Sequence, residues 1–233
     1  MAEEIRERLS LIHERIRRAA HRAGRRAEDV TLITVSKTFD AETVRKAVDA
    51  GARDLGENRV QEAAGKVTKV RADGLRWHLI GHLQANKARL AVKTFDFIHS
   101  IDSRELVERL DRISGEESRR PSVLVQVDLG REPTKTGARE EDLQAIVEAI
   151  DGAGNLELCG LMTLPPFSES CEDARPYFIR LRELLETLNR SRTVERRLTH
   201  LSMGMTNDFE VAVEEGATMI RIGTAVFGAR EKR

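Results

Sequence analysis

Short apolar runs alternate along the chain with segments whose apolar residues recur at helical spacing. The helical segments place an apolar side chain every three or four residues, as in Leu106, Leu110 and Ile113 and again over 143–150. Eight short runs rich in β-branched residues are expected to be strands. They are 31–36, 53–57, 77–81, 97–101, 122–128, 156–161, 198–202 and 219–223. This alternation is typical of a parallel sheet built from strand and helix units.

Eight such units over 233 residues predict a single (β/α)8 TIM barrel, an α/β fold, in preference to an open doubly wound sheet. No linker rich in Pro, Gly or Ser interrupts the series, so we expect one domain over 1–233. An extra amphipathic helix at 3–23, with Ile5, Leu9, Ile12 and Ile16 on one face, is expected to close the bottom or side of the barrel. Only residues 224–233 follow the eighth strand, so no C-terminal β domain is expected.

Charge and composition restrict the class of ligand. Thirty-nine basic residues balance thirty-nine acidic ones and aromatic residues are only 4% of the chain, which argues against nucleic acid as a partner. Two cysteines, Cys159 and Cys171, cannot form a disulfide framework, and no Cys/His cluster has metal-ligand spacing. No stretch is long and apolar enough to span a membrane. We therefore expect a cytoplasmic protein without a metal, whose partner is a small molecule.

Polar residues follow several predicted strands, at the end where TIM barrels carry their chemistry. Lys37 follows the first strand, and partial desolvation of its amine would suit a lysine that forms Schiff bases. A lysine that reaches the rim and binds carbonyl groups explains this position equally well. Arg221 lies between two isoleucines in the eighth strand, so the alternation directs it into the barrel. It needs an acceptor there, either a ligand phosphate or ring nitrogen, or a carboxylate such as Glu57 or Asp128.

The loops after strands seven and eight have the features of a phosphate site. Residues 202–208 (SMGMTND) and 223–228 (GTAVFG) offer hydroxyl groups and glycines beside short helical segments. In TIM barrels these two loops commonly bind phosphate through backbone N–H groups. Helix capping by Thr206 and Thr224 explains either loop alone, whereas the pairing of the two loops favours phosphate binding.

Seven sequence blocks point to a known family. They are SKT at 36–38, GENRVQE at 56–62, WHLIG at 77–81, LQANK at 83–87, GLMTLPP at 160–166, LSMGMTNDF at 201–209 and RIGTAVFG at 221–228. In this order, and over nearly the whole chain, they resemble the pyridoxal phosphate homeostasis protein family.

The resemblance implies the barrel of the alanine racemase N-terminal domain, with pyridoxal 5'-phosphate (PLP) as the cofactor. It implies that PLP is held as a Schiff base on Lys37, with Arg221 at the pyridine nitrogen and Asn58 near the ring. The phosphate cradle that it implies consists of Ser202, Thr206, Gly223 and Thr224.

Three positions depart from the family pattern. Phe39 and Asp40 stand where a proline usually follows the lysine, but Asp40 can cap the next helix. Thr206 replaces a serine and keeps its hydroxyl group. Asp128 replaces a common asparagine and adds a negative charge near the mouth of the barrel. His78, in the WHLIG block, is expected to be a hydrogen-bonded core residue and not a catalyst.

The resemblance implies a function in vitamin B6 homeostasis and amino-acid balance, in which the chain holds PLP without robust catalysis and without catalytic residues. PLP-dependent enzymes are the expected recipients, and a monomer is the expected state. The alternative is a PLP-dependent racemase or decarboxylase of the same fold. A two-base racemase needs a second acid/base, and the single tyrosine, Tyr177, lies in a segment expected to pack as a helix. A third interpretation, a Schiff-base enzyme acting on a sugar phosphate without a cofactor, would have Glu57 as its acid/base.

Overall fold

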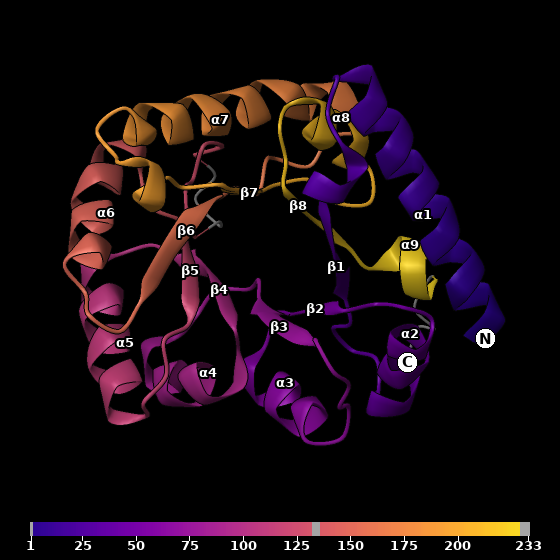
Figure 1. Ribbon diagram of the computed structural model, residues 1–233, viewed down its shortest axis with the longest axis horizontal. Helices are drawn as coiled ribbons and strands as arrows, with labels where there is room; N and C mark the ends of the chain where they lie inside the picture. The colour runs from indigo at the N-terminus through magenta and orange to yellow at the C-terminus, as the bar shows by residue number, and fades with distance from the viewer. Residues whose placement is uncertain (1, 132–135, 229–233) are drawn as a thin grey trace.

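All eight predicted strands form, and they pair in chain order into one closed parallel barrel (Figure 1). The computed structural model describes residues 2–131 and 136–228. The strands are β1 (Thr31–Val35), β2 (Asp54–Glu57), β3 (Arg76–Leu79), β4 (Phe97–Ile101), β5 (Ser122–Gln126), β6 (Glu157–Met162), β7 (His200–Ser202) and β8 (Met219–Ile222). The predicted bounds differ from these by at most two residues at either end. The TIM-barrel class predicted from the sequence is confirmed.

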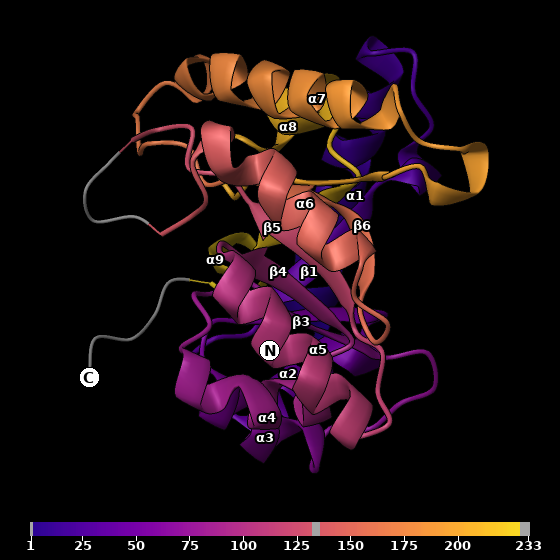
Figure 2. The ribbon, with the colours of Figure 1, turned by 90° about the vertical axis from the view of Figure 1, so that its left-hand side faces the viewer.

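Helices surround the barrel and cover its outer face, with α5, α6 and α7 on the side that Figure 2 presents. In the described part of the chain the helices are α1 (Ala2–Arg22), α2 (Ala41–Asp49), α3 (Val60–Val67), α4 (Ala88–Thr94), α5 (Arg104–Glu116), α6 (Leu143–Asp151), α7 (Arg175–Asn189), α8 (Phe209–Glu214) and α9 (Thr224–Phe227). Short 3₁₀ turns lie at Ala27–Asp29, Ala85–Lys87, Glu140–Asp142, Cys171–Ala174 and Val194–Arg196. The predicted domain range, 1–233, also covers residues 1, 132–135 and 229–233, which lie outside the described residues.

The buried apolar residues form two separate clusters because side chains alternate between the two faces of each strand. The larger cluster lies between the outside of the barrel and the helices. The smaller one consists of Ile33, Leu124, Met162 and Met219, which come from four different strands and fill the barrel interior. Polar interior positions lie beside this small cluster, and they include the functional side chains described below.

The first helix packs on the outside of the barrel against elements from the other end of the chain. Ile5, Leu9, Ile12 and Ile16 form its buried face, as predicted. The helix contacts α8, α9 and α2 (Figure 1), and Arg15 pairs with Glu210 of α8 at 3.1 Å. It therefore covers the side of the barrel.

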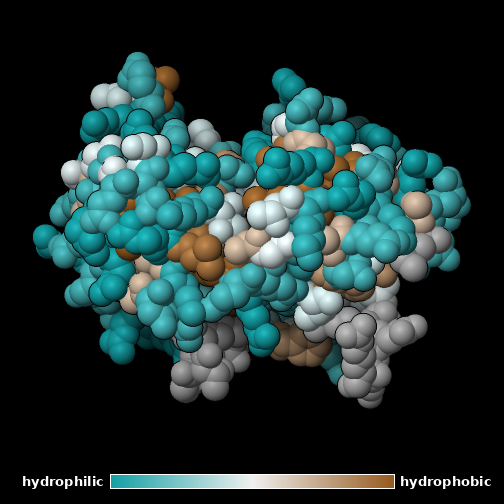
Figure 3. All heavy atoms as spheres, turned by 90° about the horizontal axis from the view of Figure 1, so that it is seen from below, coloured by the Kyte–Doolittle hydropathy of each residue, from teal (hydrophilic) through white to brown (hydrophobic). Residues whose placement is uncertain are grey.

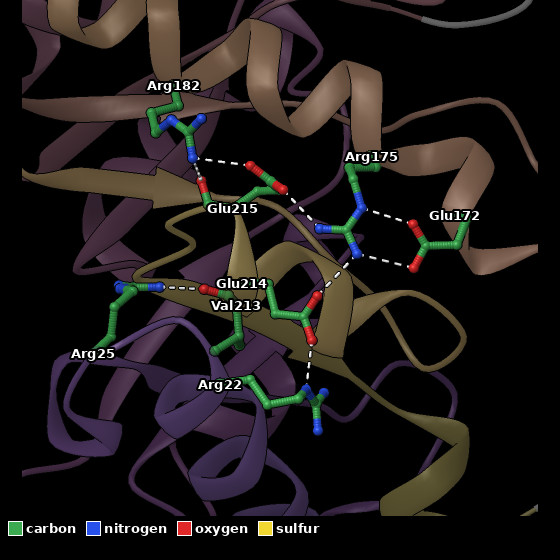
Figure 4. A network of polar contacts seen from close by, with 8 residues as sticks. All are labelled: Arg22, Arg25, Glu172, Arg175, Arg182, Val213, Glu214 and Glu215. Carbon is green, nitrogen blue, oxygen red and sulfur yellow. Dashed lines mark hydrogen bonds and ion pairs between the residues drawn. The ribbon is translucent and has the colours of Figure 1, made fainter.

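A network of ion pairs fixes the C-terminal end of α8 (Figure 4). Arg175, at the start of α7, contacts Glu214 at 2.9 Å, Glu215 at 2.6 Å and Glu172 of the preceding 3₁₀ turn at 2.7 Å. Glu214 also accepts a hydrogen bond from Arg22 of α1 at 2.7 Å. Because one guanidinium group joins three carboxylates, the network ties the segment before α7 to α8 and α1.

Most of the surface is charged. On the face that Figure 3 shows, hydrophilic residues predominate and apolar residues appear in small patches. The most exposed large apolar side chain of the described residues is Phe167, at 83%. None of the described helices is long and apolar enough to cross a membrane. Within residues 2–131 and 136–228, no group of three or more His, Cys, Asp or Glu side chains could hold a metal ion.

Candidate functional site

A cavity of about 600 Å³ opens at the carboxyl ends of the strands, where TIM barrels place their active sites. Six of the seven residues predicted to bind a cofactor line it. They are Lys37, Asn58, Thr206, Arg221, Gly223 and Thr224. These residues come from the ends of β1, β2, β7 and β8, so the closure of β8 on β1 is what brings them together.

Lys37 follows β1 after the buried Ser36 and is itself half-buried. The next residue, Thr38, has a φ of 71°, a left-handed conformation that is uncommon for a threonine. The backbone N–H of Thr38 donates to the Glu62 carboxylate of α3. Asp40 then begins α2 by accepting a hydrogen bond from the Thr43 N–H at 2.8 Å, as predicted. The segment that carries Lys37 is therefore held on its C-terminal side by two carboxylates.

A buried lysine holds the same segment on the other side. Lys66 of α3 donates to the Ser36 carbonyl at 2.7 Å, to Glu57 at 2.6 Å and to Glu62 at 2.7 Å. Glu57 also accepts the Ser36 hydroxyl at 2.7 Å, while its second oxygen is buried without a partner among the described residues. Burial raises the pKa of the Glu57 carboxyl, and the hydrogen bonds from Lys66 and Ser36 oppose that rise. The carboxylates of Glu57 and Glu62 and the ammonium group of Lys66 thus fix the backbone on either side of Lys37.

Glu57 does not line the cavity, because it faces α3 on the outer side of β2. The cofactor-free sugar-phosphate interpretation depended on Glu57 as its acid/base. That carboxylate is instead occupied by Lys66 and Ser36, so the geometry does not support this interpretation.

Arg221 points into the barrel, as predicted, and is only 3% exposed. It donates to the Ser202 hydroxyl at 2.7 Å and to the Thr163 carbonyl at 2.9 Å. The carboxylate partners considered from the sequence, Glu57 and Asp128, were wrong: the acceptors found for its side chain are neutral oxygens. Burial lowers the pKa of the guanidinium to about 10, so it remains a cation at neutral pH. A buried cation that also lines the cavity is suited to an electron-rich ligand atom.

Ser202 occupies a different place from the one expected for a phosphate ligand. Its hydroxyl lies against Arg221 and His99 in the barrel interior, and it is not among the residues that line the cavity. The short strand β7 ends at Ser202, and the chain then passes Gly204 before it reaches the rim. Ser202 therefore lies below the residues that line the cavity, and it contacts one of them, Arg221.

Thr206 and Asp208 line the cavity after a sharp turn at Gly204, which has a φ of 94°. A Cβ atom at Gly204 would lie 2.5 Å from the Cβ of Ala212 in α8, so only glycine fits there. Asp208 accepts the Met205 N–H at 2.5 Å, and burial raises the pKa of its carboxyl. The turn thereby presents Thr206 at the start of α8.

Asn58 is positioned by a close contact between two loops. A Cβ atom at Gly81, in the loop after β3, would lie 2.4 Å from the Asn58 carbonyl oxygen. The absence of a side chain at Gly81 therefore allows the loop after β2 to bring Asn58 to the cavity.

The loop after β6 forms a cavity wall that the sequence analysis did not assign. Residues 164–168 and the neighbouring Cys171 and Ala174 line this side, and Phe167 is at its exposed edge. The block GLMTLPP contains the first part of this wall, and its position directly after a strand was the available signal. The ion pairs of Arg175 anchor the wall immediately after Ala174 (Figure 4).

Two residues that depart from the family pattern have different surroundings. Phe39 lines the cavity and stacks on Phe227 of α9, with ring centroids 4.6 Å apart. Asp128 does not line the cavity; its carboxylate accepts the Arg131 N–H at 3.0 Å. The negative charge of Asp128, which was expected near the ligand, therefore binds a backbone N–H of its own loop.

Few ionisable groups face the cavity. Among the described residues they are Lys37, Cys171, Asp208 and Arg221, with no histidine or tyrosine. The chain's only tyrosine, Tyr177, lies on α7 and does not reach the cavity. The site thus presents an amine, a buried cation and hydroxyl-bearing loops.

Comparison with known proteins shows to which class of protein the chain belongs. The family model described as the alanine racemase N-terminal domain matches residues 8–231. Proteins called pyridoxal phosphate homeostasis protein from Aquifex aeolicus and Pseudomonas aeruginosa are each 43% identical to this chain. The alignments cover 97% of the chain in both cases, with 98% of the first relative and 96% of the second.

Solved structures give the same result. PipY of Synechococcus elongatus is 41% identical, and 96% of this chain aligns with 100% of that one. The TM-score is 0.86 for PipY without PLP and 0.83 for PipY with PLP bound. The chain belongs to the pyridoxal phosphate homeostasis protein family, a branch of the alanine racemase N-terminal barrel.

Proposed function

We propose that this protein binds PLP as a Schiff base on Lys37 and serves intracellular vitamin B6 homeostasis and amino-acid balance. The observation that carries the proposal is the convergence of Lys37, the buried Arg221 and the last two loops on one cavity. The relationship to PipY, which has been solved with PLP bound, supports the same ligand.

Lys37 supplies the nucleophile. When bound, PLP supplies an aldehyde and an electron-withdrawing ring. Lys37 would hold that aldehyde through its Nζ atom as a Schiff base, a condensation that releases one water molecule and requires no oxidant or reductant. The ion pairs of Lys66 with Glu57 and Glu62 orient Lys37 by fixing the residues on either side of it.

Arg221 and the last two loops would bind the two ends of PLP. Arg221 would donate an N–H to the lone pair of the ring nitrogen, and its charge would disfavour protonation of that nitrogen. Thr206, Gly223, Thr224 and the first N–H groups of α9 would bind the phosphate, since these N–H groups have no partner within the helix. Ser202 does not line the cavity and would act on the ring through Arg221. Asn58, which lines the cavity, would lie near the ring.

Holding PLP without robust catalysis fits the groups present. A racemase or decarboxylase needs further acid/base groups beside the Schiff base, and among the described residues only Cys171 and Asp208 could supply them. The Asp208 carboxylate already accepts a backbone N–H. The curated relatives are named homeostasis proteins. We therefore propose a monomeric, single-domain cytoplasmic protein that releases PLP to dependent enzymes and has no catalytic residue of its own.

Reduction with borohydride tests the proposal directly. The purified protein with added PLP should show a visible absorbance band, and reduction should fix the label on the peptide that contains Lys37. Lys37→Ala should abolish both, and Lys46→Ala, a lysine away from the cavity, should change neither. A protein that stays unlabelled would refute the proposal. Turnover of an amino acid that Lys37→Ala abolishes would establish the racemase or decarboxylase alternative instead.

A further inference from the structure

A continuous line of polar side chains crosses the barrel interior beneath Arg221. Asp54 of β2 contacts His78 of β3 at 2.8 Å, and His78 contacts His99 of β4 at 2.9 Å. His99 contacts the Ser202 hydroxyl of β7 at 2.9 Å, and Ser202 accepts from Arg221 at 2.7 Å. Every member is at most 6% exposed. The line begins near the opposite rim, where Arg76 pairs with Asp54 at 2.8 Å.

With both imidazole rings neutral and Asp54 ionised, only one arrangement of protons satisfies all of these contacts. The guanidinium of Arg221 can only donate, so Ser202 presents a lone pair to it and turns its single proton toward Nδ1 of His99. Nε2 of His99 then carries the ring proton and donates to Nδ1 of His78. Nε2 of His78 in turn donates to the Asp54 carboxylate, which can only accept. Every hydrogen bond therefore points from Arg221 toward Asp54.

We propose that His99, His78 and Asp54 are positioning residues for Arg221, which form a one-way hydrogen-bonded chain that keeps Ser202 an acceptor and directs the guanidinium to the ligand. The effect on PLP rests on the proposed function; the chain itself does not. Without His99, the Ser202 proton would lose its acceptor and could turn toward Arg221. The second contact of Arg221, with the Thr163 carbonyl, would then hold the guanidinium alone.

Both imidazole rings must stay neutral for the chain to exist. A second proton on His78 would either face the Nε2–H of His99 or force His99 into its other tautomer, which reverses the hydrogen bonds between His78, His99 and Ser202. The charged groups around the pair are Asp54, Arg76, Asp96, His200 and Arg221. Burial lowers the pKa of His78 and lowers the pKa of His99 further, with Arg221 and the neighbouring histidines acting in the same direction on His99.

Nitrogen-15 NMR of the two rings tests the chain without any ligand. We expect both His78 and His99 to be neutral with the proton on Nε2, and unchanged across the range in which an ordinary histidine titrates, about pH 5 to 8. A proton on Nδ1 of either ring, or titration of either ring in that range, would overturn the proposal. His200 provides an internal comparison outside the chain.

A pair of variants tests the effect on the ligand. His99→Leu removes the acceptor of Ser202, whereas the control His200→Leu removes a histidine that binds Thr218 and lies outside the chain. We expect His99→Leu to weaken PLP binding about tenfold, which is the scale of one net hydrogen bond, and to shift the visible band. His200→Leu should move neither. An unchanged affinity and band in a folded His99→Leu would refute the positioning role. If the wild-type protein forms no band, the proposed function fails, and the NMR result still decides the chain.

Discussion

Replacing Lys66 by methionine would remove the ammonium group that bridges Glu57 and Glu62. The side chains of Lys66 and Glu57 are 7% and 0% exposed, so Glu57 would keep a buried charge without its partner. Breaking a buried ion pair in this way costs about 3–5 kcal/mol. For a domain of this size the corresponding loss in Tm is about 10 °C. Thermal unfolding followed by circular dichroism measures it.

A matched control is available in the neighbouring helix. Lys46→Met makes the same change in a pair with Glu42 whose side chains are 30% and 78% exposed. Such a pair contributes only about 0.3–0.5 kcal/mol, so the Tm of this variant should stay close to that of the wild type. Adding Glu57→Gln to Lys66→Met should recover most of the lost stability, because no buried charge then remains.

The loss caused by Lys66→Met should also depend on pH. The pKa of Glu57 is already raised by burial, and removing the lysine raises it further. A folded state with a raised carboxyl pKa binds more protons than the unfolded chain, so stability falls as the pH rises above the ordinary value of 4.5. The variant should therefore lie closer to the wild type in acid than at neutral pH. A loss no larger than that of Lys46→Met, or a loss independent of pH, would refute this reasoning.

Two further predictions concern a turn and the thiols. Gly204→Ala should destabilise the protein by more than about 1 kcal/mol in urea unfolding, because it strains a φ of 94° and brings a Cβ atom within 2.5 Å of α8. Gly65→Ala, in α3 with open space around it, should be neutral or stabilising, and equal losses in the two variants would contradict the explanation. Ellman's reagent should label Cys171, which is exposed, and not Cys159 until the protein unfolds, since burial raises the pKa of the Cys159 thiol. Rapid labelling of both thiols in the native protein would disprove this.

The sequence predicted the barrel because each strand is a short apolar run and each run ends in polar residues. Strand alternation also gave the correct side for Arg221, which depends only on its two isoleucine neighbours. How far an inward-facing residue lies from the cavity does not follow from this alternation. Ser202 is on the inner face, as a phosphate ligand would be, but the turn at Gly204 leaves it below the residues that line the cavity.

The sequence alone did not predict which side chains of neighbouring strands contact one another. His78 was expected to be a hydrogen-bonded core residue, and this is confirmed. Its partners, Asp54 and His99, depend on the register between β2, β3 and β4, which periodicity within one strand does not determine. The same holds for Lys66, whose burial follows from how α3 packs on the barrel.

The closure of β8 on β1 has a consequence for synthesis on the ribosome. Lys37 is translated long before Arg221 and residues 223–228. The helix α1 likewise cannot make its contacts with α8 until α8 has been translated, since Arg22 and Glu214 are 192 residues apart in the chain. Contacts of such long range form slowly, and the nascent barrel remains open along this seam until they do. The nascent chain can therefore assemble the cavity at the carboxyl ends of the strands only after the segment that carries β8 has been translated.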